Sequence, residues 1–242
     1  FDIIFCAGPH HISEIRQIEK FYKLKKKLLI EYGYPRIDDL YINNDKKKYP
    51  KNMTKTILIA PSWGKNSITD LIIIDLISIL LRSNFKIIYR PHKMSFVQNN
   101  KIIKLVQNKF SKNKLFKFDT SNSSTSTLYK SDILIADWGS TSADFSFGLK
   151  KPVLFINTPQ KIRNEKYEII SKSSFETEIR KYVGSILEID NIENINESIY
   201  DLIKKTKNYT NSINLISKKF IYNHLNSANV GSKLIIKYYL ER

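Results

Sequence analysis

The sequence is short of several features that define common protein classes, and cysteine is the clearest case. Cys6 is the single cysteine among 242 residues, which excludes an internal disulfide framework and a cysteine-based zinc cluster. A lone thiol fits a reducing compartment. His10 and His11 have no cysteine or carboxylate partner at a metal-ligand spacing, so we expect no metal.

Long hydrophobic runs are missing as well. The longest candidate, residues 71–81, is interrupted by Asp75 and Ser78 and falls short of the roughly 18 to 20 apolar residues that a membrane span needs. The first seven residues carry no basic leader, which argues against a signal peptide. Because the chain starts with Phe1 and not with methionine, we expect it to begin inside a longer protein.

Acidic residues are few relative to basic ones. The 40 lysines and arginines outnumber 23 aspartates and glutamates, which gives a net charge of +17. This excess attracts anionic partners such as nucleic acid, an anionic membrane face or a phosphorylated substrate. Most lysines are spread along the chain and can equally be solvated surface, so charge alone does not select a partner.

What the chain does contain is an alternation of apolar runs with helix-like segments. Residues 131–157 show the pattern best: the apolar run 133–136, a polar turn, a short helix, and a second apolar run from Pro152. This unit is typical of a parallel α/β sheet, and its turn lies where open sheets bind ligands. Ser140 or Thr141 can cap the short helix. The start of this helix then either binds a phosphate or is only a capped helix end.

The alternation predicts an α/β fold with a doubly wound, Rossmann-like parallel sheet and closing C-terminal helices. We expect residues 1–43 to be the tail of a preceding α/β domain, because two strands and a helix cannot close a core. The polar, lysine-rich stretch 44–55 is the predicted linker, and residues 56–242 are the predicted nucleotide-binding domain.

Three polar turns follow strands of this sheet, at residues 62–65, 90–93 and 137–144. Since the carboxyl ends of parallel strands share one edge, we expect these turns to meet and to bind a diphosphate without a metal. The sequence has no Gly-x-x-x-x-Gly-Lys, Gly-x-Gly-x-x-Gly or Gly-x-Ser-x-Gly motif. The candidate residues in the turns are Ser62, Trp63, Lys65, Arg90, Pro91, His92, Asp137, Gly139, Ser140, Thr141, Ser142 and Asp144.

Each of these residues also has a structural interpretation. His92 either donates to a phosphate or packs at a loop edge, and Trp63 either stacks on a ring or packs. Lys65 either reaches a phosphate or is solvated. Asp144 accepts a hydrogen bond from a substrate hydroxyl, a backbone amide or a lysine. Arg36 and Asp38 are better suited to a structural ion pair than to a ligand contact.

In order along the chain, the motifs GYPRID (33–38), IAPSW (59–63), RPH (90–92), SDILIADWGS (131–140) with Asp144-Phe145, and KPV (151–153) resemble the carboxyl-terminal half of CDP-glycerol glycerophosphotransferases. These are the teichoic-acid and capsule polymerases of the GT-B architecture. The resemblance implies a GT-B type fold. It also implies that His92 binds the donor pyrophosphate, that Ser140, Thr141 and Ser142 hold phosphate, and that Asp144 orients donor or acceptor.

The resemblance implies a transferase that moves glycerol- or ribitol-phosphate from a CDP-activated donor, with no tightly bound cofactor, to a polymeric or lipid-linked surface acceptor. His92, Arg90 and Asp144 would be its catalytic residues. The catalytic base of the family lies in an amino-terminal Trp-His-Gly type motif that this sequence does not contain. The expected location is the cytoplasmic face of the membrane, on anionic lipid.

Two alternatives remain at this point. The first is a nucleotide-sugar glycosyltransferase of the same GT-B architecture, which would attack an anomeric carbon and not phosphorus. The second is a non-catalytic nucleic-acid-binding module, which the charge suggests but no binding motif supports, so we expect no specific nucleic-acid partner.

Overall fold

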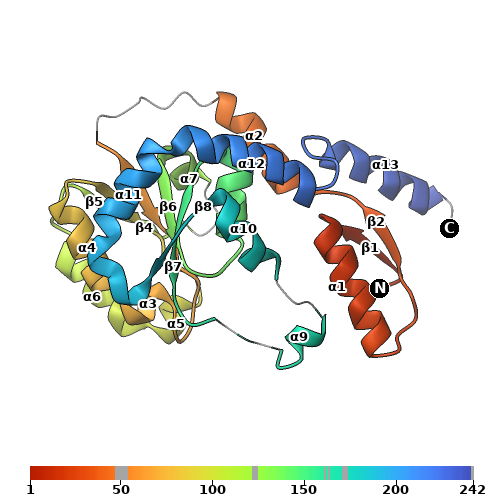
Figure 1. The fold of residues 1–242 in the computed structure, drawn as a ribbon, viewed down its shortest axis with the longest axis horizontal. Coiled ribbons are helices and arrows are strands. Elements are labelled where there is room, and N and C mark those ends of the chain that lie inside the picture. Colours follow the sequence, from red (N-terminus) through yellow and green to blue (C-terminus); the bar gives the residue numbers. More distant parts are fainter. Residues whose placement is uncertain (47–53, 122–124, 161, 163, 171–173, 241–242) are drawn as a thin grey trace.

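The chain folds into a large α/β unit and a small one, seen side by side in Figure 1. The structure is a computed structural model, and it describes residues 1–46, 54–121, 125–160, 162, 164–170 and 174–240. The large unit is a six-stranded, wholly parallel sheet with the strand order β5-β4-β3-β6-β7-β8. Its strands are β3 (Thr56–Ile59), β4 (Lys86–Tyr89), β5 (Phe116–Phe118), β6 (Ile133–Ala136), β7 (Val153–Asn157) and β8 (Gly184–Glu188).

Helices cover both faces of this sheet, as a doubly wound fold requires. One face carries α3 (Ile68–Leu71), α4 (Ile73–Arg82), α5 (Ser95–Gln98), α6 (Asn100–Phe110) and, after the 3₁₀ turn η2 (Ile189–Asn194), α11 (Ile195–Lys204). The other face carries α7 (Ser126–Lys130), α8 (Thr141–Ala143), the π-helix η1 (Asp144–Gly148), α10 (Phe175–Val183) and α12 (Thr206–Phe220). The predicted α/β class and parallel sheet are therefore confirmed.

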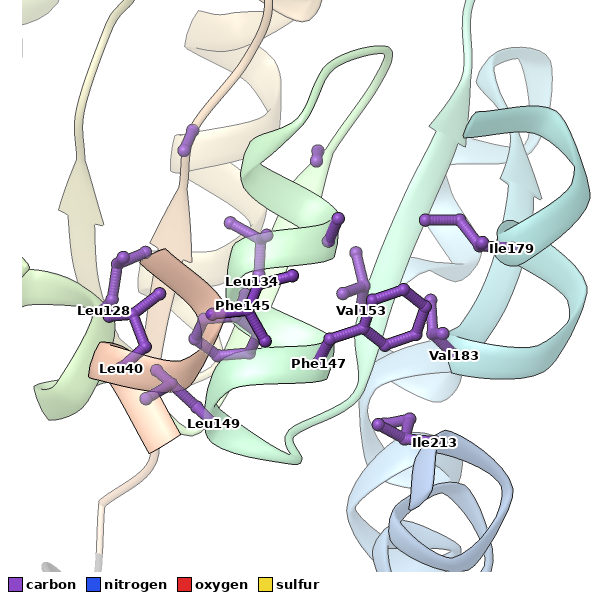
Figure 2. Close-up of a cluster of buried hydrophobic side chains, with 14 of the residues drawn as sticks. Leu40, Leu128, Leu134, Phe145, Phe147, Leu149, Val153, Ile179, Val183 and Ile213 are labelled. Atoms are coloured by element: carbon purple, nitrogen blue, oxygen red, sulfur yellow. The ribbon is translucent and has the colours of Figure 1, made fainter. Parts of the chain in front are cut away.

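The strands alternate their side chains between two hydrophobic cores. In β3, Leu58 joins one core while Ile57 and Ile59 join the other, as the period of two in a strand dictates. Figure 2 shows the first core, in which Leu40, Phe145 and Phe147 are buried together. Every residue of β3 and β6 is buried, so the polar groups at the carboxyl ends of these strands sit on a rigid base.

The small unit holds the parallel pair β1 (Ile3–Cys6) and β2 (Leu28–Glu31) with α1 (Pro9–Phe21). The last helix, α13 (Ser227–Leu240), lies along this unit and not on the large sheet (Figure 1). The chain crosses between the units twice, and the two crossings are hydrogen-bonded to each other. The Asp38 carboxylate accepts from the backbone N–H groups of Leu225 and Ser227 at 2.8 Å each, and Ser227 Oγ accepts from Tyr34 N at 3.0 Å.

Helix α2 (Pro35–Lys46) was not expected from the sequence. It runs from the predicted tail into the predicted linker, and residues 47–53 of that linker lie outside the described part. Ile37 and Leu40 are its buried hydrophobic residues, too few to show a helical pattern, yet both belong to the first core of the large unit. The domain boundaries at residues 43 and 55 stay predictions, although α2 packs on the large unit.

Smaller differences concern element ends. The sequence of residues 96–110 predicts a single helix, but the structure divides it into α5 and α6 at Asn99, whose φ of −119° and ψ of 29° leave the helical region. The sequence also predicts a helix over residues 192–207, whereas the structure has the 3₁₀ turn η2 up to Asn194 and then α11, which ends at Lys204. Ser140 does stand before α8, but its side chain makes no capping hydrogen bond, so the capping prediction was wrong. Its backbone is already helical, with φ −67° and ψ −16°.

The buried ammonium group of Lys151 makes the free energy of unfolding depend on pH. Its Nζ donates to the carbonyl oxygens of Tyr129 (2.8 Å) and Ser131 (2.7 Å), and burial lowers its pKa from 10.5 to about 8. Between pH 8 and 10.5 the unfolded chain therefore holds more protons at this site than the folded chain. The free energy of unfolding should rise with pH across that window, by about 2–3 kcal/mol from this lysine.

Urea unfolding followed at pH 7.5 and at pH 9.5 tests this expectation. The Lys151→Met variant should lose a large part of the rise, while Lys130→Met, at an exposed position, should keep it. Lys150 contributes in the same direction, because burial lowers its pKa to about 8 as well. A Lys151→Met variant with the slope of the unmodified chain would contradict the assignment.

Candidate functional site

The loops that follow β4, β3 and β6 meet at the carboxyl edge of the sheet. These three strands are neighbours, so their loops lie together as the sequence predicted. Two adjoining cavities open there, of about 500 and 430 Å³. They share the residues Ala60, Pro61, His92, Ser140 and Thr141. His92 and Ser140 thus line the same space, although they lie in the loops after two different strands, β4 and β6.

The first cavity is walled by aromatic and small polar side chains. From the strand loops it takes Ser62, Trp63, Trp138 and Gly139. From the segment after β7 it takes Gln160, Ile162, Tyr167, Ser174 and Glu176, with Tyr167 at the start of α9 (Tyr167–Ile170). Gly139 has a φ of +144°, which an L side chain rarely adopts, so this turn requires glycine.

Trp138 is held firmly in this wall. Its Nε1 donates to the carbonyl oxygen of Thr158 at 3.0 Å, and the guanidinium of Arg180 lies 4.1 Å from its ring centroid. Arg180 is 3% exposed, and burial lowers its pKa. Its Nε and Nη2 have no hydrogen-bond partner among the residues that the structure describes. The rings of Trp138 and Phe155, with centroids 4.1 and 5.0 Å from the guanidinium carbon, stabilise the buried cation.

The second cavity is lined by cationic side chains. Arg36, Arg90, His92 and Lys93 line it together with the carboxylate of Asp144. Four basic groups around one carboxylate leave an excess of positive charge in this cavity, which suits an anionic ligand. Tyr34 and Pro91 complete the lining with Ala60, Pro61, Ser140 and Thr141.

His92 is exposed and oriented by its own backbone. Its Nδ1 accepts the N–H of Met94 at 3.1 Å, so in the neutral imidazole the proton is on Nε2. The ring also stacks against Trp63, with centroids 5.9 Å apart and planes at 27°. In the neutral ring, Nδ1 is therefore the acceptor and Nε2–H the donor.

Arg90 lines the second cavity. Its Nη1 donates to Thr127 Oγ1 at 3.2 Å, and burial lowers its pKa while the nearby Asp119 carboxylate opposes that effect. Asp119 follows β5, the strand next to β4. A fourth strand end therefore supports the site, which the sequence argument had not included.

The ion pair of Arg36 and Asp144 connects α2 to the cavity. Arg36 Nε lies 2.6 Å from Asp144 Oδ2, and the side chains are 47% and 9% exposed. Burial raises the pKa of Asp144, and Arg36 partly offsets this. The other oxygen, Oδ1, is buried and has no hydrogen-bond partner in the described part of the chain. The expected ion pair of Arg36 exists, but with Asp144 and not with Asp38, and Arg36 lines the cavity as well.

The packing of α2 on η1 explains this pairing. A Cβ at Gly148 would lie 2.7 Å from the Cβ of Leu40, so only glycine allows the two helices to approach so closely. Arg36 lies one turn before Leu40 in α2, and Asp144 lies one turn before Gly148 in η1. Because Leu40 and Gly148 are in close contact, Arg36 and Asp144, each one turn earlier in its helix, also come together.

Three candidate residues do not line either cavity. Asp137 is 1% exposed, and its carboxylate accepts from the backbone N–H groups of Ser62 (2.6 Å), Ile68 (2.9 Å) and Trp138 (2.7 Å). It joins the loop after β3 to the loop after β6. Ser142 is buried and donates to the carbonyl oxygen of Gly139 at 2.9 Å, and Lys65 is exposed on the turn before α3. The other nine candidates line one or both cavities.

Among the described residues, no group of three or more histidines, cysteines, aspartates and glutamates is placed to hold a metal ion. The search for membrane-spanning helices over the same residues found none of sufficient length and hydrophobicity.

A parallel sheet with a cationic cleft at its carboxyl edge, beside a second, smaller parallel α/β unit, defines a protein of the GT-B type. The chain belongs to the family of CDP-glycerol:poly(glycerophosphate) glycerophosphotransferases, whose family model matches residues 6–230. The family expected from the sequence motifs is thereby confirmed. A search of curated proteins finds no match.

Solved structures with the same fold include the wall teichoic acid polymerase TagF. One TagF variant has a TM-score of 0.60 at 19% identity, and another, soaked with CDPG, has 0.62 at 22%. All of this chain is covered, but only 60% and 59% of those chains. The UDP-GlcNAc 2-epimerase from Neisseria meningitidis, bound to UDP-GlcNAc, has a TM-score of 0.56 at 18% identity, over 100% of this chain and 61% of that one.

Proposed function

We propose that this chain carries the donor-binding part of a transferase that moves a polyol phosphate from a CDP-activated donor to a teichoic-acid-like or surface-polysaccharide acceptor. The observation that carries the proposal is the convergence of Arg90, His92 and Arg36 on one cavity beside Ser140. Membership of the glycerophosphotransferase family supports glycerol phosphate as the transferred group, and ribitol phosphate is the related alternative. The chain spans about 60% of TagF, so activity of the complete enzyme is part of the proposal.

The two cavities suggest how such a donor would lie. The cytosine ring would occupy the first cavity, where Trp63 and Trp138 offer flat aromatic surfaces. The diphosphate would lie at the shared wall, in reach of His92 Nε2 and of the backbone at Ser140 and Thr141. The polyol would then enter the second cavity, beside the Asp144 carboxylate.

The proposed reaction is a phosphoryl transfer. An acceptor hydroxyl oxygen attacks the β-phosphorus of the donor, the bond from that phosphorus to the bridging oxygen breaks, and CMP leaves with the bonding electron pair. His92 and Arg90 would stabilise the charge that builds on the phosphate oxygens, and Asp144 would orient a hydroxyl. The hydroxyl proton would go to a base outside these residues, because His92 is oriented to donate and Asp144 is paired with Arg36.

The other parts of the proposal concern place and partners. Residues 56–242 would form the donor-binding domain, with residues 1–43 belonging to the preceding domain. The enzyme would work on the cytoplasmic side of the membrane, held there in part by its net charge of +17. Its acceptor would be polymeric or linked to lipid.

Donor discrimination tests the function directly. We expect CDP-glycerol or CDP-ribitol at millimolar concentration to raise the melting temperature of the chain by several degrees, with UDP-GlcNAc giving a smaller shift, since a ligand stabilises only the state that it binds. CMP and glycerol phosphate, added separately, provide the controls. Equal stabilisation by UDP-GlcNAc would favour a nucleotide-sugar glycosyltransferase, and no shift with any nucleotide would reject the site.

A further inference from the structure

The segment that leads from the small unit into α2 contributes a tyrosine to the second cavity. Tyr34 lines this cavity together with Arg36 and Asp144. Its side chain is half-buried and packs against the first hydrophobic core. Its phenolic hydroxyl makes no hydrogen bond to any residue that the structure describes. The hydroxyl is therefore open to a ligand in the cavity.

The backbone of Tyr34 is hydrogen-bonded on both sides of its Cα. Its N–H donates to Ser227 Oγ at 3.0 Å, in the second crossing between the units. Its carbonyl oxygen accepts from the N–H of Ile37 at 3.0 Å, in the first turn of α2. These bonds fix the direction in which the side chain leaves the backbone, and the packing of the ring fixes the rest.

A carboxylate oxygen at the same cavity also lacks a partner. Asp144 is 6% exposed, and its Oδ2 is paired with Arg36 at 2.6 Å. Its Oδ1 is buried and finds no hydrogen-bond donor among the described residues. Burial and the neighbouring Asp144 carboxylate raise the pKa of Tyr34, so the phenol keeps its proton at neutral pH. The cavity thus offers one hydroxyl donor and one unused acceptor.

We propose that Tyr34 and Asp144 together bind the vicinal diol of the polyol, and that Tyr34 selects a polyol over an alkyl group. One hydroxyl of the diol donates to Asp144 Oδ1, and the hydroxyl on the next carbon accepts from the phenolic O–H of Tyr34. Glycerol and ribitol both carry such a diol. The inference rests on the proposed function, because that function places the polyol in the second cavity.

The chemistry of this pair favours a ligand hydroxyl over a phosphate oxygen. An ionised phosphate oxygen only accepts hydrogen bonds, so the Asp144 carboxylate beside Tyr34 would repel it. A hydroxyl can donate to the carboxylate and accept from the phenol. An alkyl chain would leave both protein groups without hydrogen bonds in the bound state, and a site built to bind a hydroxyl discriminates strongly against such a ligand.

Calorimetric titration with two ligands that differ only in the diol tests the proposal. The ligands are CDP-glycerol and the propyl ester of CDP, which has the same nucleotide and diphosphate but no hydroxyl on its three-carbon chain. We expect the unmodified chain to bind CDP-glycerol at least tenfold more tightly. Tyr34→Phe keeps the ring and should weaken CDP-glycerol binding about three- to tenfold, the effect of one neutral hydrogen bond. Its affinity for the propyl ester should stay within about twofold.

Tyr41 provides the matched control on the same helix. It is also half-buried, its ring centroid lies 5.5 Å from Lys150 Nζ, and it lines neither cavity. Tyr41→Phe should bind both ligands as the unmodified chain does. If Tyr34→Phe weakened the binding of both ligands equally, Tyr34 would act through the fold or the phosphates, and the proposal would be wrong. Unchanged CDP-glycerol affinity in Tyr34→Phe would reject it as well.

The unmodified chain separates this inference from the function on which it rests. Binding of neither ligand would reject the proposed function and the inference with it. Equally tight binding of both ligands would support a nucleotide-diphosphate site and reject diol recognition alone. A preference for CDP-glycerol that falls in Tyr34→Phe and persists in Tyr41→Phe is the result that supports Tyr34 as the selecting residue.

Discussion

Replacing His92 with alanine should lower the rate of polyol-phosphate transfer by the complete enzyme about 100- to 1,000-fold, the usual cost of removing one donor that stabilises a developing oxyanion. His92 lies where both cavities meet, and its Nδ1 is occupied by the Met94 N–H, so Nε2 is its donor. The effect should be mainly on kcat if the bond strengthens as charge develops on the phosphate. The measurement is transfer of radiolabelled glycerol phosphate from CDP-glycerol to polymer.

Two further variants give this experiment its controls. His92→Gln keeps an N–H donor at a similar distance from the backbone and should recover a part of the rate. His11→Ala removes an exposed histidine that lines neither cavity, and should transfer within about threefold of the unmodified enzyme. Transfer by His92→Ala at a comparable rate would refute the assignment of His92.

The second large effect is expected at Arg36. Arg36→Met leaves Asp144 buried without its partner, which should lower the free energy of unfolding by about 1–2 kcal/mol. This is less than the 3–5 kcal/mol of a fully buried pair, because half of Arg36 is in solvent. The same change should weaken CDP-glycerol binding about tenfold or more, since a charged donor leaves the cavity. Chemical unfolding and calorimetric titration measure the two effects separately.

The molecule supplies a matched control for this variant. Arg16 and Glu19 also lie 2.6 Å apart, with 39% and 4% of their side chains exposed, but they line neither cavity. Arg16→Met should therefore cost similar stability and leave CDP-glycerol affinity unchanged. A donor affinity that falls equally in both variants would mean that Arg36 acts only through the fold. The double variant Arg36→Met/Asp144→Leu should lose less free energy of unfolding than the two single variants lose together.

The sequence was sufficient to predict which strand ends meet, and insufficient to assign every side chain there. Buried strands in regular alternation predicted the parallel sheet, and the convergence of its loops followed from topology. Asp137 shows the limit of that argument. A carboxylate directly after a strand can either bind a ligand or accept hydrogen bonds from the backbone of a loop. Asp137 has the second role because the amides of Ser62 and Ile68, which are 75 and 69 residues away in sequence, donate to it.

Arg36 was missed as a cavity residue for a related reason. Its position in the cleft depends on the close approach of Leu40 to Gly148, a contact between helices far apart in sequence. Helix α2 buries few hydrophobic residues and so showed no periodicity, and the π-helix η1 has no known sequence signal in this stretch. Both features are set by packing and not by local preference.

The hydrogen bonds between the two crossings have a consequence for synthesis on the ribosome. Tyr34 N bonds to Ser227 Oγ, 193 residues later in the chain. At 5 to 20 residues per second, about 10 to 40 seconds pass between the emergence of the two partners. During that time β1, β2 and α1 exist without the segment that closes them, while the large sheet is completed first. The small unit is thus translated before the large sheet, but the segment that closes it follows only after all the strands of that sheet.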